Sequence, residues 1–162
     1  MRFMIETNLG RVVVRAAEEG DWEAVMALIV ELAAYEEAQA EVTLTVEQLA
    51  SDAKQGRFDC TLAECEGKVV GMALHHPRYS TWKGTTWYLE DLVVTQSWRG
   101  RGVGKALMQA VVKRALDEDA QRLEWQVLDW NEGAIGFYKA LGASISSDWL
   151  NGRLTRAKLL KT

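Results

Sequence analysis

The chain has 162 residues, a length that suits one domain with a sizeable core, so we expect residues 1–162 to form a single domain. Its hydrophobic content of 48% is that of a globular protein, and its formal net charge of -4 disfavours nucleic acid and anionic membranes as partners. No stretch has the apolar length of a membrane span, and the first residues lack the apolar core of a signal peptide. Cys60 and Cys65 are spaced so that a strand would point them to opposite faces, which disfavours a disulfide. We therefore expect a cytoplasmic protein with free thiols.

Apolar periodicity, cap residues and turn signals predict elements in the order β-α-α-β-β-β-α-β-α-β. The expected strands span residues 11–16, 58–65, 68–76, 86–95, 123–128 and 153–160, and the expected helices span residues 22–36, 45–54, 102–117 and 132–141. Thr45 and Gln48 fit a capping box, Asn131 fits a helix cap, and Glu66-Gly67 fits a hairpin turn. Three successive strands after two helices favour a mixed sheet over a doubly wound one.

Residues 88–107 hold the most informative pattern, a strand followed by a glycine-rich loop and an amphipathic helix. Glycines let the backbone turn tightly and expose its N–H groups, and the N-terminus of a helix favours an anion. The glycines and the flanking cations are Gly100, Gly102, Gly104, Arg99, Arg101 and Lys105. This pattern predicts a cradle for a pyrophosphate, and the alternative is a connector with solvated charges.

Spacing excludes two common phosphate-binding loops. A Walker A loop needs four residues between its first glycine and the Gly-Lys pair, and here three separate Gly100 from Gly104. A Rossmann fingerprint needs its third glycine where Lys105 stands.

The pattern Arg99-x-x-Gly102-x-Gly104 resembles the acyl-CoA signature of the Gcn5-related N-acetyltransferase (GNAT) superfamily. Residues 128–143, in which an Asn precedes a helix with Phe-Tyr, resemble the last motif of that superfamily. Further stretches resemble its diamine branch, the spermidine/spermine and thialysine acetyltransferases, and these are residues 28–36, 82–84, 88–91 and 129–132. The resemblance covers nearly the whole chain, and it implies an α/β fold of the mixed α+β kind with a central, mostly antiparallel sheet that is splayed in the middle and flanked by helices.

The resemblance also implies acetyl-CoA as co-substrate, no metal, and a homodimer with its site near the interface. Backbone N–H groups of the strand and the loop would bind the thioester, the pantetheine arm and the pyrophosphate, and Asn131 would cap its helix and also contact the pantetheine arm. The implied binding residues are Leu92, Val93, Val94, Arg99, Gly100, Arg101, Gly102, Val103, Gly104, Lys105, Asn131 and Tyr138.

Acetyl transfer to an amine needs a base for the ammonium proton and an acid for the departing thiolate. We expect direct attack in a ternary complex, with Glu90 as the base through a water and Tyr138 as the acid. The alternatives are a Tyr138 that is only packed, and a Glu90-Asp91 pair that is one edge carboxylate and one structural ion pair. A regular strand would point the two carboxylates to opposite faces, and the resemblance implies a β-bulge that re-aims them. His75 and His76 point apart in a strand and lack a third histidine, so we expect no metal there.

Resemblance to the diamine branch implies a pocket for a primary amine formed by Glu36, Trp82, Asp91 and Trp149, in which carboxylates and indole faces bind a cation. The chain departs from the branch at Thr81, where an acidic residue is usual, and in having few acids before Trp149. A short amine such as thialysine or a diamine is therefore supported as well as spermidine is. A peptide acetyltransferase and a non-catalytic acyl-CoA sensor remain as alternatives.

Overall fold

The computed structural model describes residues 1–161, and the chain forms two compact units. Unit 1 spans Met1–Trp125 and unit 2 begins at Gln126.

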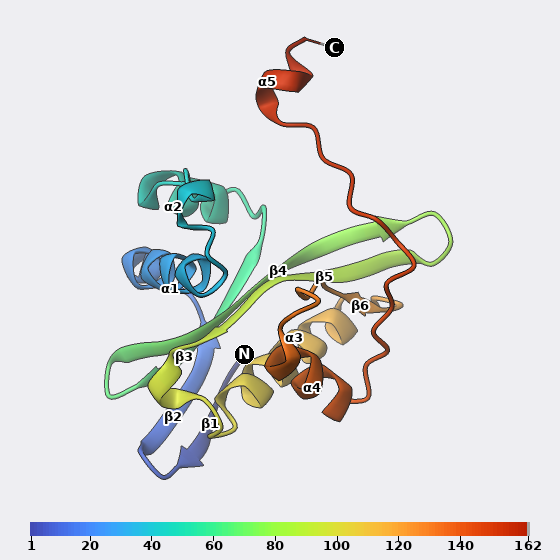
Figure 1. Cartoon of the computed structure of the whole chain (residues 1–162). Helices are drawn as coiled ribbons and strands as arrows, with labels where there is room; N and C mark the ends of the chain where they lie inside the picture. The colour runs from blue at the N-terminus through green and yellow to red at the C-terminus, as the bar shows by residue number, and fades with distance from the viewer. Residues whose placement is uncertain (162) are drawn as a thin grey trace. The chain divides into compact units, whose positions relative to one another are not determined.

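Unit 1 is a six-stranded sheet with the strands in chain order (Figure 1). Neighbouring strands are antiparallel except for the last pair, β5 and β6, which are parallel. The strands are β1 (Arg2–Thr7), β2 (Gly10–Ala16), β3 (Asp59–Cys65), β4 (Lys68–Ser80), β5 (Gly84–Val94) and β6 (Leu123–Glu124). The expected mixed, mostly antiparallel sheet with flanking helices is confirmed.

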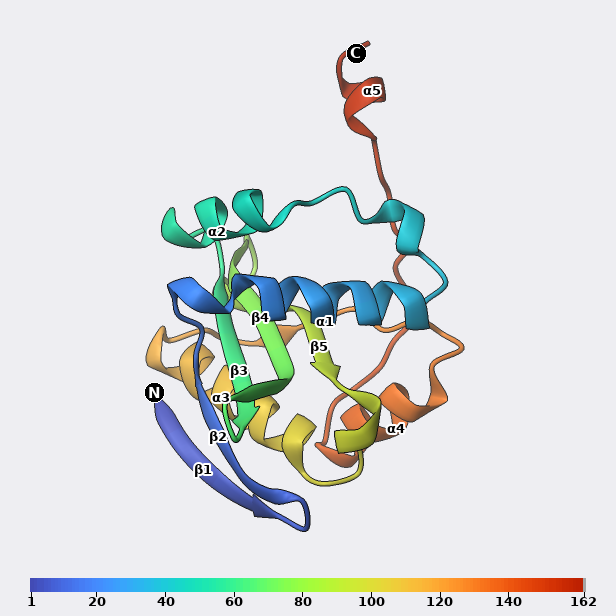
Figure 2. The same ribbon diagram turned by 90° about the vertical axis from the view of Figure 1, so that its left-hand side faces the viewer.

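Three helices cover the sheet of unit 1. They are α1 (Trp22–Tyr35), α2 (Val46–Lys54) and α3 (Val103–Asp117), and single 3-10 turns occur at η1 (Glu19–Asp21), η2 (Gln39–Glu41) and η3 (Gln96–Trp98). Helices α1 and α2 lie against one face and α3 lies against the other (Figures 1 and 2). The core under α1 and α2 contains Val25, Leu28, Leu49, Leu62, Met72, Leu74 and Val93.

Caps and turns explain where the elements begin and end. The Thr45 hydroxyl accepts a hydrogen bond from the Gln48 N–H (3.2 Å), which is half of the expected capping box. The Gln48 amide donates onward to Asp52 (2.9 Å) rather than back to Thr45. Glu66 and Gly67 have φ values of 50° and 78°, as a two-residue hairpin turn between β3 and β4 requires.

Unit 2 contains α4 (Glu132–Ala140) and α5 (Arg156–Leu159). The Asn131 side chain accepts from the Ala134 N–H (3.1 Å), which confirms its role as the cap of α4. Gly142 follows α4 with φ of 87°, so glycine ends the helix as expected.

Three expectations about the strands of unit 1 were wrong, and a fourth concerns residues 153–160 of unit 2. Residues 2–7, for which no strand was expected, form β1, because their backbone pairs with β2 from Arg2 opposite Arg15 to Thr7 opposite Gly10. Strand β4 continues past His76 to Ser80 because β5 pairs with it along this length. Strand β6 is two residues long rather than six because β5 pairs with it only at Trp87 and Tyr88.

The expected last strand over residues 153–160 is absent from the described residues. No strand of the described chain pairs with this segment, so part of its backbone satisfies its hydrogen bonds locally as helix α5. The Leu159 N–H, for example, donates to the Thr155 carbonyl (2.9 Å).

Among residues 1–161 no helix is long and apolar enough to cross a membrane.

Candidate active site

Strand β5 has a β-bulge at the two adjacent carboxylates. Leu74 of β4 pairs with Asp91, whereas His75 pairs with Leu89, so Glu90 is the extra residue. Because Asp91 lies opposite Leu74, it shares the sheet face that packs under α1. Glu90 already belongs to that face by its alternation with Leu89. The implied bulge is thus present, and it turns both carboxylates toward one face.

The Asp91 carboxyl is partly buried on this face. Burial is the main reason that its pKa is raised to about 6, and the charges of Glu90 and Glu36 add to the effect. Burial also raises the pKa of Glu36, which lies at the C-terminal end of α1. Carboxylates that are costly to ionise next to one another are relieved by a bound cation, so this face suits an ammonium group.

Glu90 is more open to solvent than Asp91. Its side chain is 55% exposed, and its Oε2 lies 3.4 Å from Nε2 of His76. The His76 ring in turn lies 5.5 Å from the Tyr88 ring. A carboxylate with access to water can receive a proton and pass it to solvent, as a base that acts through water must.

Part of the edge of β5 has no strand partner. Strand β6 pairs with β5 at Trp87 and Tyr88, and in the described chain no strand pairs with the same edge farther along. The Thr95 N–H donates to Val70 of β4 (3.0 Å), so by alternation the N–H groups of Leu92 and Val94 face the open edge, and that of Val93 faces β4. The open edge thus offers backbone donors to an extended polar ligand.

The glycine loop follows this edge directly. Gly100 and Gly102 have φ values of 72° and 83°, and a Cβ added at either would meet no atom within 4 Å, so the loop surface above them is open. Helix α3 begins at Val103, and its first turn closes with the Ala106 N–H donating to the Gly102 carbonyl (3.0 Å). The N–H groups of residues 103–105 therefore have no partner within the helix and are available to an anion.

The two loop arginines brace the loop as well as charge it. Arg99 donates from Nε to the Val94 carbonyl (2.9 Å), and its guanidinium lies 5.1 Å from the Tyr35 ring centroid. Arg101 donates from Nε to the Ser97 carbonyl (3.1 Å) and also contacts Asn8. Lys105 is exposed in the first turn of α3. The donor set fits a pyrophosphate group because it combines free N–H groups, open glycines and three cations.

In unit 2, α4 carries the Tyr138 predicted as the acid. Its ring contacts that of Phe137 edge-on, with ring centroids 5.2 Å apart. The carbonyl of Tyr138 accepts from the N–H groups of Leu141 (3.0 Å) and Ala143 (3.2 Å), which tightens the end of the helix.

Trp82 does not join Asp91 within one chain. It lies in the turn between β4 and β5 and is 83% exposed. Along the ladder from the Leu74–Asp91 pair to the Ser80–Gly84 pair the strands rise by about 20 Å. Trp149, the other expected indole, is 85% exposed in unit 2.

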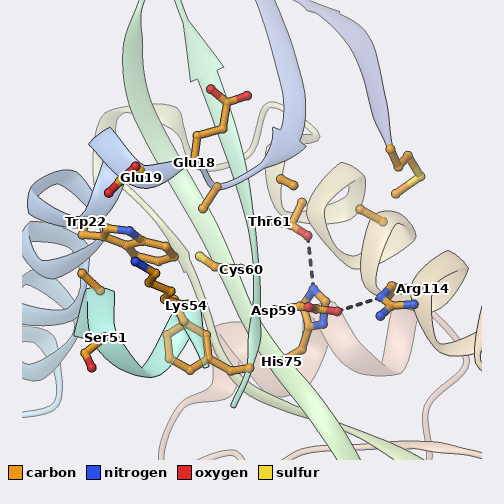
Figure 3. A pocket seen from close by; sticks show the side chains of 17 residues that line it. Glu18, Glu19, Trp22, Ser51, Lys54, Asp59, Cys60, Thr61, His75 and Arg114 are labelled. Atoms are coloured by element: carbon orange, nitrogen blue, oxygen red, sulfur yellow. Dashed lines mark hydrogen bonds and ion pairs between the residues drawn. The ribbon is translucent and has the colours of Figure 1, made fainter. Parts of the chain in front are cut away.

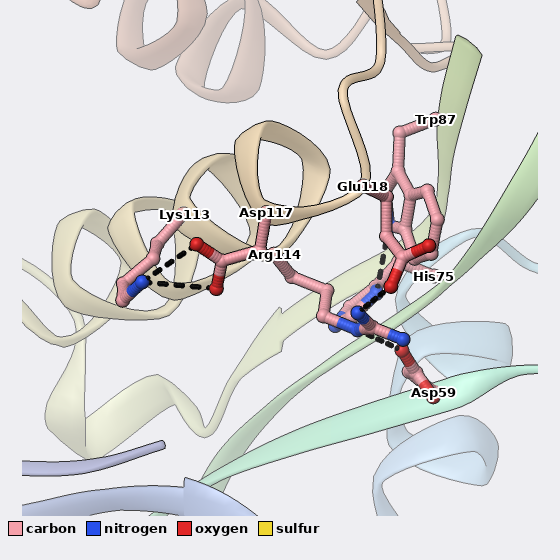
Figure 4. A network of polar contacts seen from close by, with 7 residues as sticks. All are labelled: Asp59, His75, Trp87, Lys113, Arg114, Asp117 and Glu118. Atoms are coloured by element: carbon pink, nitrogen blue, oxygen red, sulfur yellow. Dashed lines mark hydrogen bonds and ion pairs between the residues drawn. The ribbon is translucent and has the colours of Figure 1, made fainter. Parts of the chain in front are cut away.

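Sequence reasoning missed two contributors to this region. The Glu31 carboxylate accepts from the Gln96 N–H (3.3 Å) and the Thr95 hydroxyl (3.4 Å), and this contact ties α1 to the end of β5. His75 is 1% exposed, and its Nδ1 accepts from the indole N–H of Trp87 (2.9 Å), beside the bulge (Figure 4). Neither contact follows from local spacing, because each joins residues of different elements.

Comparison with known proteins gives the family. The model described as the Acetyltransferase (GNAT) family matches residues 22–143. The chain belongs to the GNAT family of acetyltransferases. It is therefore an N-acetyltransferase that uses acetyl-CoA, as the glycine loop predicts.

Relatives of this GNAT enzyme include two with named activities. It is 40% identical to a thialysine N-epsilon-acetyltransferase of Bos taurus over 142 residues, and the aligned region covers 82% of this chain and 84% of that one. It is 32% identical over 169 residues to a spermidine/spermine N(1)-acetyltransferase-like protein 1 of Homo sapiens, over 97% of this chain and 24% of that one. A solved aminoglycoside acetyltransferase from a soil metagenomic sample shares the fold, with a TM-score of 0.76 at 21% identity over 89% of this chain and 95% of that one.

Proposed function

We propose that this GNAT enzyme acetylates a primary amine of a small cationic substrate, of the thialysine or short diamine kind. The observation that carries the proposal is the acidic face at the bulge of β5, where burial and then the charges of Glu90 and Glu36 make Asp91 costly to ionise. An ammonium group offsets that cost, whereas a neutral or anionic acceptor would not. The sequence likeness to a thialysine acetyltransferase over most of both chains supports the same substrate class.

In the proposed reaction the free amine attacks the thioester carbonyl, the C–S bond breaks, and the acetyl group ends on nitrogen. Glu90, through a water, receives the proton that the ammonium loses. Tyr138 donates its phenolic proton to the departing thiolate, and the second proton that the nitrogen loses on becoming the amide returns to the phenolate. The N–H groups of Leu92 and Val94 polarise the carbonyl and hold the pantetheine arm.

The residues predicted to hold acetyl-CoA fall into three groups in this proposal. Leu92 and Val94 of β5 present their N–H groups at the edge that the pantetheine arm follows, whereas the predicted Val93 lies between them with its N–H facing β4. The loop from Arg99 to Lys105 holds the pyrophosphate with its N–H groups and its three cations. Asn131 contacts the pantetheine arm in addition to capping α4.

We further propose one GNAT domain over residues 1–162 that acts in the cytoplasm as a homodimer, without a metal. The family match runs through residues 22–143 and so includes parts of both compact units. Cys60 and Cys65 are free and buried, as in a reducing compartment. Trp82 is exposed and about 20 Å along the sheet from Asp91, so it can serve the amine pocket only from a partner subunit.

The test is release of free CoA thiol from acetyl-CoA with thialysine, putrescine, spermidine, lysine and a lysine peptide as separate acceptors. We expect turnover with thialysine or putrescine at a higher kcat/KM than with the peptide. Turnover with the peptide alone would contradict the proposal.

A further inference from the structure

The two histidines of the chain, His75 and His76, are neighbours on β4. Because side chains alternate along a strand, they point to opposite faces of the sheet. His75 is buried on the face that α3 covers, whereas His76 is partly exposed on the face that carries Glu90. His76 pairs with Tyr88, two residues before Glu90, so an imidazole lies beside the bulge and next to the proposed base.

The hydrogen bonds of the His76 ring fix where its hydrogen lies. A carbonyl oxygen can only accept, so Nδ1 carries a hydrogen and donates it to the Pro77 carbonyl (3.1 Å). Nε2 lies 3.4 Å from Oε2 of Glu90. In the neutral ring Nε2 is therefore bare and faces a carboxylate oxygen, which is also an acceptor. A proton supplied to this Glu90–His76 pair completes a hydrogen bond that the two groups otherwise lack.

The charges around this pair favour the uptake of a proton. Burial and then the charges of Glu90 and Glu36 raise the pKa of Asp91, the next residue of β5. The Tyr88 ring lies 5.5 Å from the imidazole, and Arg78 of β4 lies over the same tyrosine, 5.4 Å from the ring centroid. Burial raises the pKa of Tyr88, so this phenol stays neutral. Three carboxylates thus lie near one guanidinium, and an added proton reduces their mutual repulsion.

The imidazole is also the better chemical match for the reaction. A carboxylate alone is a weak acceptor for an ammonium proton, because carboxylic acids give up their proton well below neutral pH. An imidazole takes up a proton near neutral pH, where a general base is most effective. Glu90 can connect the two steps, since its side chain is exposed to water and also contacts Nε2 of His76.

We propose that His76 is the proton acceptor behind Glu90, so that it acts through Glu90 and not on the substrate itself. This inference rests on the proposed function. The ammonium N–H bond breaks and its electron pair stays on the nitrogen, while the proton moves to a water. A proton of that water moves to Glu90, and the Glu90 O–H proton moves to Nε2 of His76. The imidazolium then releases this proton to solvent, to which the side chain is 31% exposed, and Glu90 ends the step as a carboxylate.

The kinetic experiment compares His76→Gln with His75→Gln, a matched variant that removes the other imidazole of β4. CoA thiol release with thialysine is measured with and without added imidazole. We expect kcat/KM of His76→Gln to fall about tenfold or more and added imidazole to restore most of it, in proportion to the neutral form as the pH is varied. His75→Gln should stay within about twofold of the wild type, because its amide can replace both ring hydrogen bonds. Glu90→Gln should not respond to imidazole, since it lacks the preceding acceptor.

A second measurement tests the geometry without acetyl transfer. Long-range nitrogen–proton NMR reports which ring nitrogen carries hydrogen, and His75→Gln assigns the two rings. The Trp87 indole can only donate, so neutral His75 should carry its hydrogen on Nε2, which then donates to the Thr61 hydroxyl (3.2 Å, Figure 3). We expect the opposite arrangement in neutral His76, with hydrogen on Nδ1.

The outcomes separate this proposal from the proposed function. If the wild type acetylates an amine but His76→Gln keeps its kcat/KM, or loses it without rescue by imidazole, the relay through His76 is overturned and the proposed function stands. Neutral His76 with hydrogen on Nε2 also overturns the relay, because the nitrogen that faces Glu90 could not accept a proton. A wild type that acetylates no amine overturns both.

Discussion

At the scale of single residues, the account depends on how one extra residue in β5 changes two carboxylates. The bulge at Glu90 puts Asp91 opposite Leu74 on the α1 face, where burial raises its pKa to about 6. Glu90 remains 55% exposed. The same sequence pair, Glu-Asp, thus holds one partly buried carboxylate, which we propose binds the substrate cation, and one carboxylate with access to water.

Replacing Asp91 by Asn should weaken amine binding more than it slows the chemistry. We expect KM for thialysine or putrescine to rise about tenfold or more, with a smaller change in kcat, because the charge that pairs with the ammonium is lost. The Asp91 carboxyl binds a cation only when it is ionised, so wild-type kcat/KM should fall as the pH drops below about 6. This decrease should be absent in Asp91→Asn. Steady-state kinetics across pH check both points, and an unchanged KM would contradict this role.

His75 gives a second residue-scale prediction, on stability. Burial lowers its pKa from 6.5 to about 4, so the folded state excludes a proton that the unfolded chain takes up below pH 6.5. The contribution of the neutral His75 to the free energy of unfolding is complete above pH 6.5. About 3 kcal/mol of this contribution is lost as the pH falls to 4. Asp91, whose pKa is raised, acts in the opposite direction as pH falls through 6.

The two effects are separated with His75→Gln, whose amide can accept from Trp87 and donate to Thr61 without titrating. Urea unfolding at several pH values should show that the wild type loses more stability than the variant between pH 6.5 and 4. Equal losses in the two proteins would show that His75 is not held neutral.

At the scale of elements, close backbone packing sets the position of β5. Gly71 of β4 leaves no room for a side chain, since a Cβ there would lie 2.9 Å from the Val93 carbonyl oxygen and 3.2 Å from Leu107 of α3. The glycine lets α3 approach the strand whose edge the acetyl-CoA proposal uses.

Gly71→Ala should therefore destabilise the fold by about 1–3 kcal/mol, because the added methyl group displaces backbone or core atoms. Gly20→Ala is the matched control, since a Cβ at Gly20 would meet nothing within 4 Å. Thermal unfolding should give a lower Tm for Gly71→Ala only. Equal melting temperatures for the two variants would contradict the packing argument.

Local sequence signals predicted the elements that local interactions form. Thr45, Asn131 and Glu66-Gly67 act within a few residues, and the helices and hairpin that they bound are present. The ends of strands were predicted poorly because pairing decides them: β6 ends where β5 ceases to pair with it, and residues 153–160 have no strand beside them in the described chain. The same holds for the site, where the glycine loop was visible in the sequence but the contacts of Glu31 and His75 join distant elements.

At the scale of the whole molecule, Trp82 distinguishes an amine site built from one chain from an amine site that two subunits share. If Trp82 serves the amine pocket of a partner, then each site takes Glu90 from one subunit and Trp82 from the other. A mixed dimer of Trp82→Ala and Glu90→Gln then has one site with both substitutions and one site with neither. Refolding the two weakened variants together should restore about a quarter of wild-type activity, because half of the dimers are mixed and half of their sites are intact. Activity that only averages the two variants would contradict a shared site, and light scattering checks the dimer directly.

The central claim is acetyl transfer from acetyl-CoA to a small amine by direct attack, with Tyr138 as the acid. The most direct measurement is CoA thiol release with thialysine by wild type and Tyr138→Phe, beside acetyl-CoA binding by calorimetry. The account predicts that Tyr138→Phe keeps its affinity for acetyl-CoA while kcat falls by about 10²-fold or more. Full turnover in Tyr138→Phe would contradict the role of the tyrosine, and no turnover by the wild type with any amine, despite acetyl-CoA binding, would contradict the claim itself.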